Sequence, residues 1–214
     1  MTKIKTSKYT CPKCGKESDF TMYESVNVDL NSKLKEKVLS GDFFSWTCPH
    51  CQQKYQIHYD FLYHDMKRDF MIYYAPNGCE DINKTVNDML TRLKGMRNTT
   101  YRSVDSYNRL LEKIRIFEAN LNDIVIEFAK VLMKFNKKAK VPIGCDVLFE
   151  KYLPNAKDDI LVFRPIDSSG PRKELMLLEK QFYDKYQTSI MENEKFMMDL
   201  YCDNINEKWV LNRL

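Results

Sequence analysis

Apolar and polar residues alternate over much of the first third of the chain, which is the pattern of half-buried β-strands. The stretch from Tyr55 to Tyr59 has Tyr55, Ile57 and Tyr59 on one face and polar residues between them. Two aromatic runs, Phe43–Thr47 and Phe70–Tyr74, are also typical of strands. An earlier alternating stretch places four apolar residues on one face: Phe20, Met22, Val26 and Val28. The pattern predicts a small β domain over about residues 8–76.

One segment inside this region has helical spacing instead. Leu34 and Val38 lie four residues apart, Asn31 or Ser32 can cap the start of a helix, and Ser40–Gly41 can end it. We therefore expect a short helix inserted between strands.

From Asp81 onward the apolar period lengthens to about 3.6, which indicates helices. Further helices are expected from about Asp105 and from Asn122 or Asp123. The break between them is expected because Asn120 can adopt the left-handed conformation that ends a helix, and Asn122 or Asp123 can cap the next one. We interpret these segments as a helical hairpin, with one long helix as the alternative. The apolar faces of the three helical segments are Ile82, Val86, Met89, Leu90 and Leu93; Leu110, Leu111, Ile114, Phe117 and Leu121; and Ile124, Val125, Phe128, Val131, Leu132 and Phe135.

Pro142 and Gly144 suggest a boundary, after which the pattern changes again. Ile160–Phe163 and Leu175–Leu178 are predicted to be short strands on either side of a loop. Asp203–Leu211 has a cap-like start and is predicted to form a terminal helix.

Two Cys-Pro-x-Cys pairs add chemistry to this β domain: Cys11, Cys14, Cys48 and Cys51. Four thiolates in two tight pairs are a standard ligand set for one tetrahedral, structural Zn²⁺. Proline stiffens each turn, and a glycine after the second cysteine gives the chain a positive φ without strain. Gly15 fills that position in the first pair, whereas Gln52 stands there in the second. Free thiols or a disulfide pair are the alternative interpretation.

Composition favours the metal interpretation. The chain has 214 residues, 43% of them hydrophobic, which suits one or two domains with a real core. Its first residues lack the apolar stretch of a signal peptide, and no apolar run is long enough to span a membrane. We therefore expect a cytoplasmic protein, and paired cysteines in a reducing cytoplasm are more often metal ligands than disulfides.

The cysteine pairs, together with Asn27–Gly41 and Leu62–Asp65, resemble the CpXC domain family of bacteria and archaea. Leu111–Glu118 and Asp123–Glu127 are similar to the helical second half of that family. The resemblance covers roughly residues 8–135, and it implies zinc binding without an assigned activity. The glutamine at position 52 departs from the expected glycine, so we expect either a strain cost of about 1 kcal/mol or a shifted turn there, with the ligands unaffected.

Other candidate residues have simpler interpretations. His50 lies between two ligands, and His58 is expected on the outer face of its strand. His64 beside Asp65 is a possible general base, but a histidine in a surface loop is the favoured interpretation. The cysteines without a nearby partner are expected to be free thiols in or near the core, with a nucleophilic Cys79 as the alternative: Cys79, Cys145 and Cys202.

Nucleic-acid binding is a further possibility. A formal net charge of +4 is low for a nucleic-acid-binding protein. Candidate phosphate contacts are Lys134, Lys137, Lys138 and Lys140. Candidate base-stacking residues, more simply explained as core, are Phe43, Phe44, Trp46 and Tyr59. Candidate anchors for a protein partner are Phe182, Tyr183, Tyr186 and Trp209.

We therefore predict an α+β protein: a zinc-ribbon-like antiparallel β domain with an inserted short helix, then a helical hairpin and a small α/β C-terminal lobe. Residues 1–136 are expected to form the CpXC-like region, with the ribbon over about 8–76 and the helical part over about 80–136; residues 137–214 form the lobe. The predicted function is that of a zinc-binding, non-enzymatic binding or adaptor protein of the bacterial cytoplasm. We expect a protein partner, weak or no nucleic-acid binding and no membrane association. The alternatives are a nucleic-acid-binding zinc ribbon and an enzyme with a site near His64 at the ribbon–helix junction.

Overall fold

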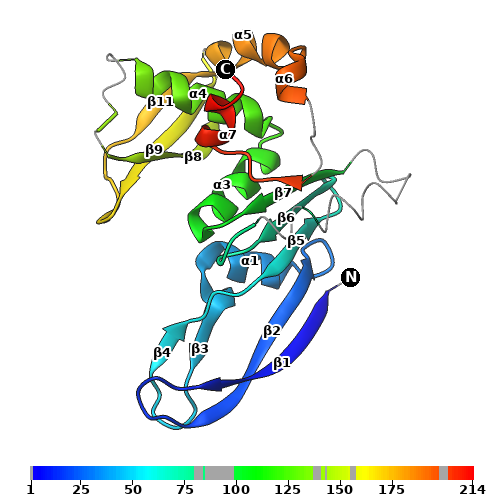
Figure 1. Cartoon of the computed structure of the whole chain (residues 1–214), viewed down its shortest axis with the longest axis vertical. Helices are drawn as coiled ribbons and strands as arrows, with labels where there is room; N and C mark the ends of the chain where they lie inside the picture. Colours follow the sequence, from blue (N-terminus) through cyan, green and yellow to red (C-terminus); the bar gives the residue numbers. More distant parts are fainter. Residues whose placement is uncertain are drawn as a thin grey trace. The chain divides into compact units, whose positions relative to one another are not determined.

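The computed structural model describes residues 2–79, 84, 99–136, 141–142, 144–154, 158–197 and 202–214. It is a mixed α+β protein, as predicted, and divides into two compact units, Met1–Tyr107 and Asn108–Leu214 (Figure 1). Apart from Lys84, the helix predicted from Asp81 lies outside the described residues. The sequence division between residues 136 and 137 stays a prediction, because it follows the family resemblance rather than compactness.

Unit 1 supplies five strands of the main sheet, in the order β1-β2-β5-β6-β7. Strands β1 and β2 form an antiparallel hairpin, as do β5 and β6, whereas β2–β5 and β6–β7 are parallel pairs. The β domain was predicted to be antiparallel, and these two parallel pairs correct that prediction. Strands β5 and β6 both alternate between buried and half-buried residues, which fixes the face that packs on the core. The strands are β1 (Lys3–Thr10), β2 (Glu17–Asn27), β5 (Phe61–Asp65), β6 (Phe70–Tyr74) and β7 (Thr100–Val104).

The inserted helix is present as α1 (Ser32–Ser40). It ends at Gly41, whose φ of 84° lies in the left-handed region that glycine adopts without a Cβ penalty. The Tyr107 hydroxyl donates to the Val38 carbonyl at 2.7 Å, so one of the last carbonyls of the helix has a partner.

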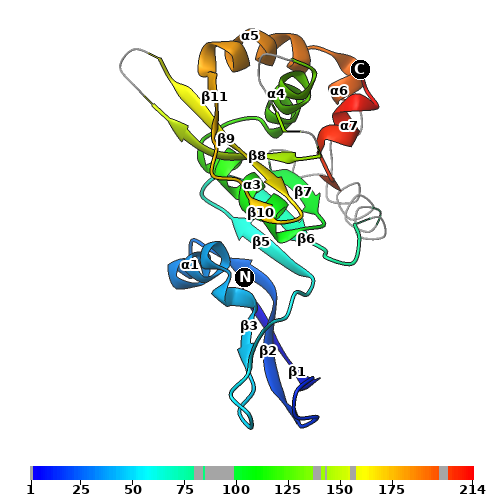
Figure 2. The ribbon, with the colours of Figure 1, turned by 90° about the vertical axis from the view of Figure 1, so that its left-hand side faces the viewer.

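The aromatic run after α1 is only partly a strand, which corrects the sequence prediction. A 3₁₀ turn, η1 (Asp42–Phe44), turns Phe43 and Phe44 into the core, and the strand β3 (Ser45–Thr47) begins after it. Its antiparallel partner β4 (Lys54–Gln56) stops before Ile57, whose N–H donates to the Phe44 carbonyl at 2.8 Å. The tip of this hairpin lies beside the tip of the β1–β2 hairpin (Figures 1 and 2).

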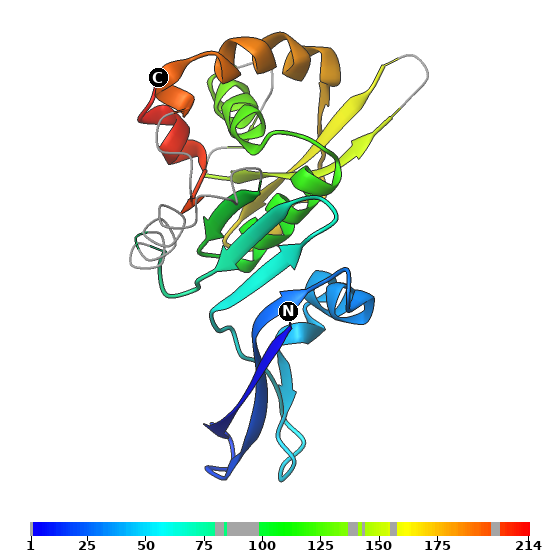
Figure 3. The same cartoon turned by 90° about the vertical axis from the view of Figure 1, so that its right-hand side faces the viewer.

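Unit 2 combines a small sheet with helices. Strand β9 has β8 on one side and β10 and β11 on the other, all antiparallel. Helix α4 packs against α5, α7 and β8 (Figure 3). The strands of this sheet are β8 (Asp146–Leu153), β9 (Ile160–Asp167), β10 (Gly170–Pro171) and β11 (Met176–Glu179), and β12 (Cys202–Asp203) is not part of it. The helices are α3 (Tyr107–Glu118), which begins at the last residue of unit 1, α4 (Asp123–Phe135), α5 (Lys180–Met191), α6 (Glu194–Met197) and α7 (Glu207–Leu211).

The predicted break between two helices is confirmed. Asn120 has a φ of 53°, and the Asn122 side chain accepts a hydrogen bond from the Ile124 N–H at 2.9 Å. Helices α3 and α4 are therefore separate, and the single long helix is excluded. The two C-terminal strands and the terminal helix are also confirmed as β9, β11 and α7.

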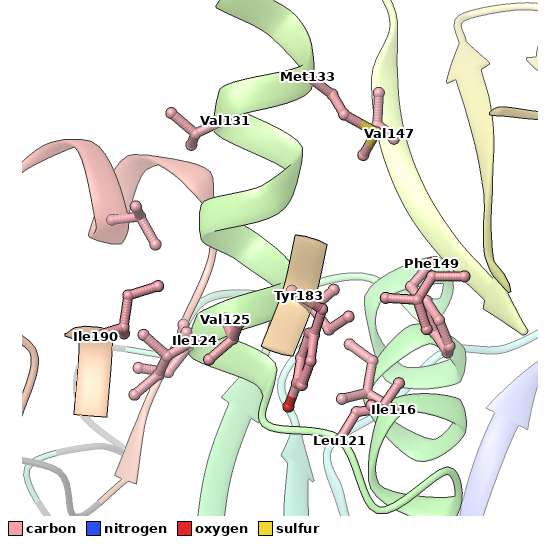
Figure 4. Close-up of a cluster of buried hydrophobic side chains, with 14 of the residues drawn as sticks. Ile116, Leu121, Ile124, Val125, Val131, Met133, Val147, Phe149, Tyr183 and Ile190 are labelled. Carbon is pink, nitrogen blue, oxygen red and sulfur yellow. The ribbon is translucent and has the colours of Figure 1, made fainter. Parts of the chain in front are cut away.

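The core of unit 2 is formed by side chains from α3, α4, β8, β9 and α5, together with residues near the C-terminus (Figure 4). Tyr183 and Trp209, two of the four candidate partner anchors, are buried in it. The Tyr183 hydroxyl accepts from the Asn122 N–H at 2.8 Å, which ties α5 to the start of α4. Phe182 and Tyr186 are half-buried. None of the helices among the described residues has the length and apolar run needed to cross a bilayer.

Candidate metal centre

Each Cys-Pro-x-Cys pair folds into a turn that we call a knuckle, and the two knuckles have the same backbone hydrogen bonds. In the first, the Gly15 N–H donates to the Cys11 carbonyl at 2.9 Å, and the Cys11 N–H donates to the Lys16 carbonyl at 3.0 Å. In the second, the equivalent bonds run from Gln52 to Cys48 at 2.9 Å and from Cys48 to the carbonyl of Gln53 at 2.9 Å. The knuckles are thus two copies of one local structure.

The residue after each second cysteine has a positive φ, as this turn requires. Gly15 has a φ of 67° and Gln52 a φ of 58°. Gln52 therefore keeps the turn geometry and bears the steric cost of a Cβ in the left-handed region, about 1 kcal/mol. Its side-chain amide donates to the Pro49 carbonyl at 3.2 Å, which offsets part of that cost.

The knuckles bring four sulfur atoms together from two hairpins. Cys11 Sγ lies 3.6 Å from Cys51 Sγ, and Cys14 Sγ lies 3.7 Å from Cys48 Sγ. All four lie within 4.8 Å of one another, a group that could hold a metal ion. Four sulfurs placed about 2.3 Å from a central zinc would be about 3.8 Å apart along each edge of the tetrahedron. The distances of 3.6 and 3.7 Å are close to that edge length and far longer than a disulfide bond, and these cysteines are free thiols here.

The electrostatics of the cluster favour thiolate at one sulfur in particular. Burial acts to raise the pKa of Cys11, but the backbone N–H groups of Cys14 and Lys13 and the neighbouring thiols outweigh it and lower this pKa to about 6. The Gln53 N–H acts to lower the pKa of Cys51, but burial and the other cysteines raise it to about 11. The lowered pKa makes the thiolate, which is the form that binds a metal ion, easier to reach at Cys11 than in an ordinary cysteine.

Tyr55 lies beside this cluster on β4. The Cys11 thiol donates to its hydroxyl oxygen at 3.8 Å, and the Tyr55 ring packs near Trp46 with centroids 6.1 Å apart. Burial and the bond to Cys11 raise the pKa of Tyr55 to about 12, so the hydroxyl stays protonated. Once Cys11 is a thiolate, this hydroxyl can donate to the sulfur, and such a donor stabilises a thiolate ligand from outside the coordination shell. The alternation of the strand predicted that Tyr55 faces inward, but not that it contacts a ligand.

The two knuckles offer a direct test of the cost of Gln52. We expect Gln52→Gly to stabilise the protein by up to about 1 kcal/mol, because glycine removes the Cβ at a positive φ. Gly15→Ala should destabilise by a similar amount, although a Cβ at Gly15 would meet no atom within 4 Å. Denaturant unfolding of the metal-loaded protein measures both changes. Equal and near-zero effects would mean that the turns are not strained.

The histidines do not join the cluster. His50 is exposed at the knuckle tip. His58 is exposed, as predicted, and its Nδ1 lies 3.0 Å from the Tyr74 hydroxyl. His64 lies on strand β5 rather than in a loop, so the loop interpretation was wrong. It is half-buried, and burial lowers its pKa.

Asp65 does not orient His64 either. Neighbouring residues of a strand point to opposite faces, and Asp65 is buried with its carboxylate held by the Arg68 N–H and guanidinium, both at 3.0 Å. The alternation within β5 therefore separates the two side chains that stand together in the sequence.

The other cysteines lie apart from the four-sulfur group. Cys79 is buried, and burial raises its pKa, which makes it a poor nucleophile. Cys145 is buried with its sulfur 3.9 Å from an Asp167 oxygen. The side chain of Cys202 lies outside the described residues.

The candidate nucleic-acid contacts are mostly engaged elsewhere. Phe43, Phe44, Trp46 and Tyr59 are all buried, and three of their rings pack against one another. Lys134 forms ion pairs with Glu207 at 2.7 Å and with Asp146 at 3.6 Å. The remaining three lysines of that group lie outside the described residues: Lys137, Lys138 and Lys140.

A buried ionic cluster in unit 2 was not predicted. Lys113 lies 2.9 Å from Asp123 and 3.3 Å from Glu127, and Lys130 lies 3.0 Å from Glu112 and 2.9 Å from Glu127. All five side chains are buried between α3 and α4. The apolar spacing of α3 and α4 could have indicated this cluster, because Glu112, Lys113 and Lys130 stand next to apolar residues that were assigned to the core.

The charges in this cluster are strongly coupled. Burial acts to lower the pKa of Lys130, but the carboxylates of Glu112 and Glu127 outweigh it, and the pKa is raised. Burial raises the pKa of Glu112, an effect that Lys130 opposes. Glu112 also accepts the Phe149 N–H at 2.7 Å, which links the two helices to β8. The cluster therefore connects α3, α4 and β8 inside unit 2.

Comparison with known proteins agrees with the geometry of the cysteines. A family model described as CpXC protein matches residues 9–130, more than half of the chain. The match includes both knuckles, α1 and most of the α3–α4 pair. No curated protein and no solved structure matches the chain. The chain therefore belongs to the CpXC family.

Proposed function

We propose that this CpXC protein holds one structural Zn²⁺ in a zinc ribbon and acts as a non-enzymatic binding or adaptor protein of the bacterial cytoplasm. The observation that carries the proposal is the four-sulfur group of Cys11, Cys14, Cys48 and Cys51, with its tetrahedral spacing. Two antiparallel hairpins that each carry one knuckle are the arrangement expected of a zinc ribbon.

The donor set favours zinc and a structural role. Four thiolates suit zinc among the common divalent ions, whereas magnesium and calcium prefer oxygen. Four protein ligands also complete a tetrahedron, and a catalytic zinc keeps one position for water or substrate. The cytoplasm is favoured because the thiols must stay reduced to bind metal.

Partner binding is supported by an exposed apolar patch in unit 1, formed by Leu30 and Met66. These side chains are 70% and 53% exposed. Asn27 holds the patch together: its Oδ1 accepts the Leu30 N–H at 3.3 Å, and its Nδ2 lies 2.6 Å from the Met66 sulfur. Asp29 adds a second link, because its carboxylate accepts the Lys67 N–H at 2.8 Å. Two turns are thereby fixed so that both side chains project into solvent, where a partner can cover them.

The test compares two kinds of ligand. Leu30→Lys and Met66→Lys should abolish capture of a specific protein from lysate, while Leu153→Lys, an exposed leucine in unit 2, should leave it unchanged. Nucleic-acid binding, followed by fluorescence anisotropy, should be weak and disappear near about 150 mM salt, as expected when few phosphates are contacted. Tight nucleic-acid binding at that salt concentration would overturn the adaptor role.

A further inference from the structure

A groove lies along one edge of the sheet in unit 2, and we call it the β11 groove. It has a volume of about 610 Å³ and runs between β11, the last turn of α4 and the first half of α5. Apolar and polar surface line it in nearly equal parts. The side chains that matter for its filling are Leu132, Met133, Met176, Leu178, Phe182 and Tyr186. The groove therefore exposes part of the core of unit 2 to solvent beside β11, the outer strand of the sheet.

Strand β11 forms the margin of the sheet here and leads directly into α5 (Figure 2). Among the described strands it pairs only with β9. Met176 and Leu178 are half-buried against the core, whereas Leu177, on the other face of the strand, is 65% exposed, although it also borders the groove. A strand with one unpaired edge presents backbone donors and acceptors to any other strand that fits.

Two other outer strands of this protein, β1 and β8, carry features that discourage such pairing, and β11 does not. Strand β1 carries Lys3, Lys5 and Lys8 and has an irregular register at its start. Strand β8 has a register shift next to Lys151. Lysines and bulges are common ways of protecting an edge strand from association. Strand β11 has only Met176, Leu177 and Leu178 before its final glutamate, with no shift in register.

We propose that β11 pairs with β11 of a second copy of this chain, antiparallel about a two-fold axis through Leu177. Directly opposite residues of an antiparallel pair share a face, so Leu177 meets its own copy and Met176 meets Leu178 of the other chain. The same register places Glu174 of each chain opposite Lys180 of the other. Lys180 is already held by Asp184 at 2.6 Å, and its ammonium has further donors for a second carboxylate.

The two-fold pairing also closes the groove. An axis perpendicular to the sheet keeps α4 and α5 of both copies on the same side of one continuous sheet. The Met176 and Leu178 side chains of each copy then fill the opening beside the other copy's strand. The exposed Leu177 side chains, which have no cover in a single chain, bury each other on the opposite face.

A second copy fits this edge better than an unrelated extended peptide. A foreign peptide could bond to the free backbone edge of β11 and cover the apolar side chains of the groove. It would not explain why Glu174 and Lys180, which have opposite charges, flank β11. Glu174 precedes the strand and Lys180 follows it, three residues on either side of Leu177. Residues equally distant from the axis face each other in this pairing, so the negative Glu174 and the positive Lys180 meet twice across the dimer.

Sedimentation velocity across protein concentrations tests the proposal on the full chain. Wild type should be a dimer, and Leu177→Lys should weaken self-association by roughly 100-fold, because two leucines are exposed again and two like charges face each other. The matched control is Ile4→Lys, a 58% exposed apolar residue on the edge strand β1, which should leave the dimer unchanged. A monomeric wild type at about 100 µM, or a dimer that survives Leu177→Lys, would overturn the proposal.

The register has its own test. Leu177→Cys should form an intermolecular disulfide on mild oxidation, because directly opposite Cα atoms in an antiparallel pair are about 4.5–5.5 Å apart and within disulfide reach. Glu174→Lys should weaken the dimer, and adding Lys180→Glu in the same chain should restore it. A monomer that instead binds an extended apolar peptide at β11 would replace the second copy with a foreign partner. None of these measurements depends on zinc binding. A failure of the dimer proposal can therefore be distinguished from a failure of the proposed function.

Discussion

Replacing Cys14 by serine is expected to abolish stoichiometric zinc binding and to unfold the region around the two knuckles. Structural zinc contributes about 10–16 kcal/mol to the folding of small zinc domains, whereas the whole stability of a typical domain is about 5–15 kcal/mol. The four sulfurs come from two hairpins whose tips have no other shared anchor of this kind among the described residues. Loss of one ligand therefore removes the main connection between those tips.

Two measurements check this result. Elemental analysis should give one zinc per chain for wild type and much less than one for Cys14→Ser. Fluorescence of Trp46, which precedes the second knuckle on β3, should report the local unfolding in a Trp209→Phe background. Cys79→Ser is the matched control, because Cys79 is a buried cysteine of the same unit outside the cluster, and this variant should keep its zinc. Undiminished zinc in Cys14→Ser would contradict the assignment.

Replacing Lys113 by methionine is expected to destabilise unit 2 by about 3–5 kcal/mol. The substitution keeps most of the side-chain volume but leaves the buried carboxylates of Asp123 and Glu127 without their shared cation, 2.9 and 3.3 Å away. A buried charge that loses its partner bears its full desolvation cost, which is much larger than the net gain from the pair. Thermal unfolding followed through Trp209, in a Trp46→Phe background, measures the change in that unit.

The chain contains a matched surface pair for comparison. Lys180 lies 2.6 Å from Asp184 one turn along α5, and both side chains are partly exposed. Lys180→Met should cost less than about 1 kcal/mol, because water solvates the carboxylate that remains. Similar losses for Lys113→Met and Lys180→Met would show that burial adds nothing to the first pair.

The sequence predicted the local features of the metal centre and of the helices because each rests on neighbouring residues. Cys-Pro-x-Cys defines a knuckle by itself, and Asn120 with Asn122 defines a break between helices by itself. The positive φ of Gln52 follows from its place after a second cysteine. Features of this kind need no knowledge of the tertiary structure.

The features that the sequence did not predict depend on contacts between distant residues. The strand after the second knuckle ends at Gln56 because Ile57 bonds to Phe44, which no periodicity reveals. The ion pairs of Lys113 and Lys130 form because α3 and α4 lie together, which the spacing within either helix does not reveal. His64 was expected in a loop, but it lies on β5, a strand that exists through its pairing with β2 and β6.

The pairing of sulfurs across hairpins has a consequence for how the chain folds. The closest sulfurs belong to residues 40 and 34 positions apart, Cys11 with Cys51 and Cys14 with Cys48. Closing a loop of that length costs about 3 kcal/mol of chain entropy before any contact forms. When an ion bound to one knuckle is then also bound by the other, the free energy of the new metal–sulfur bonds offsets that entropy cost. We expect an excess of the metal to place one ion on each knuckle, so that the loop closes only after one of the two ions has dissociated.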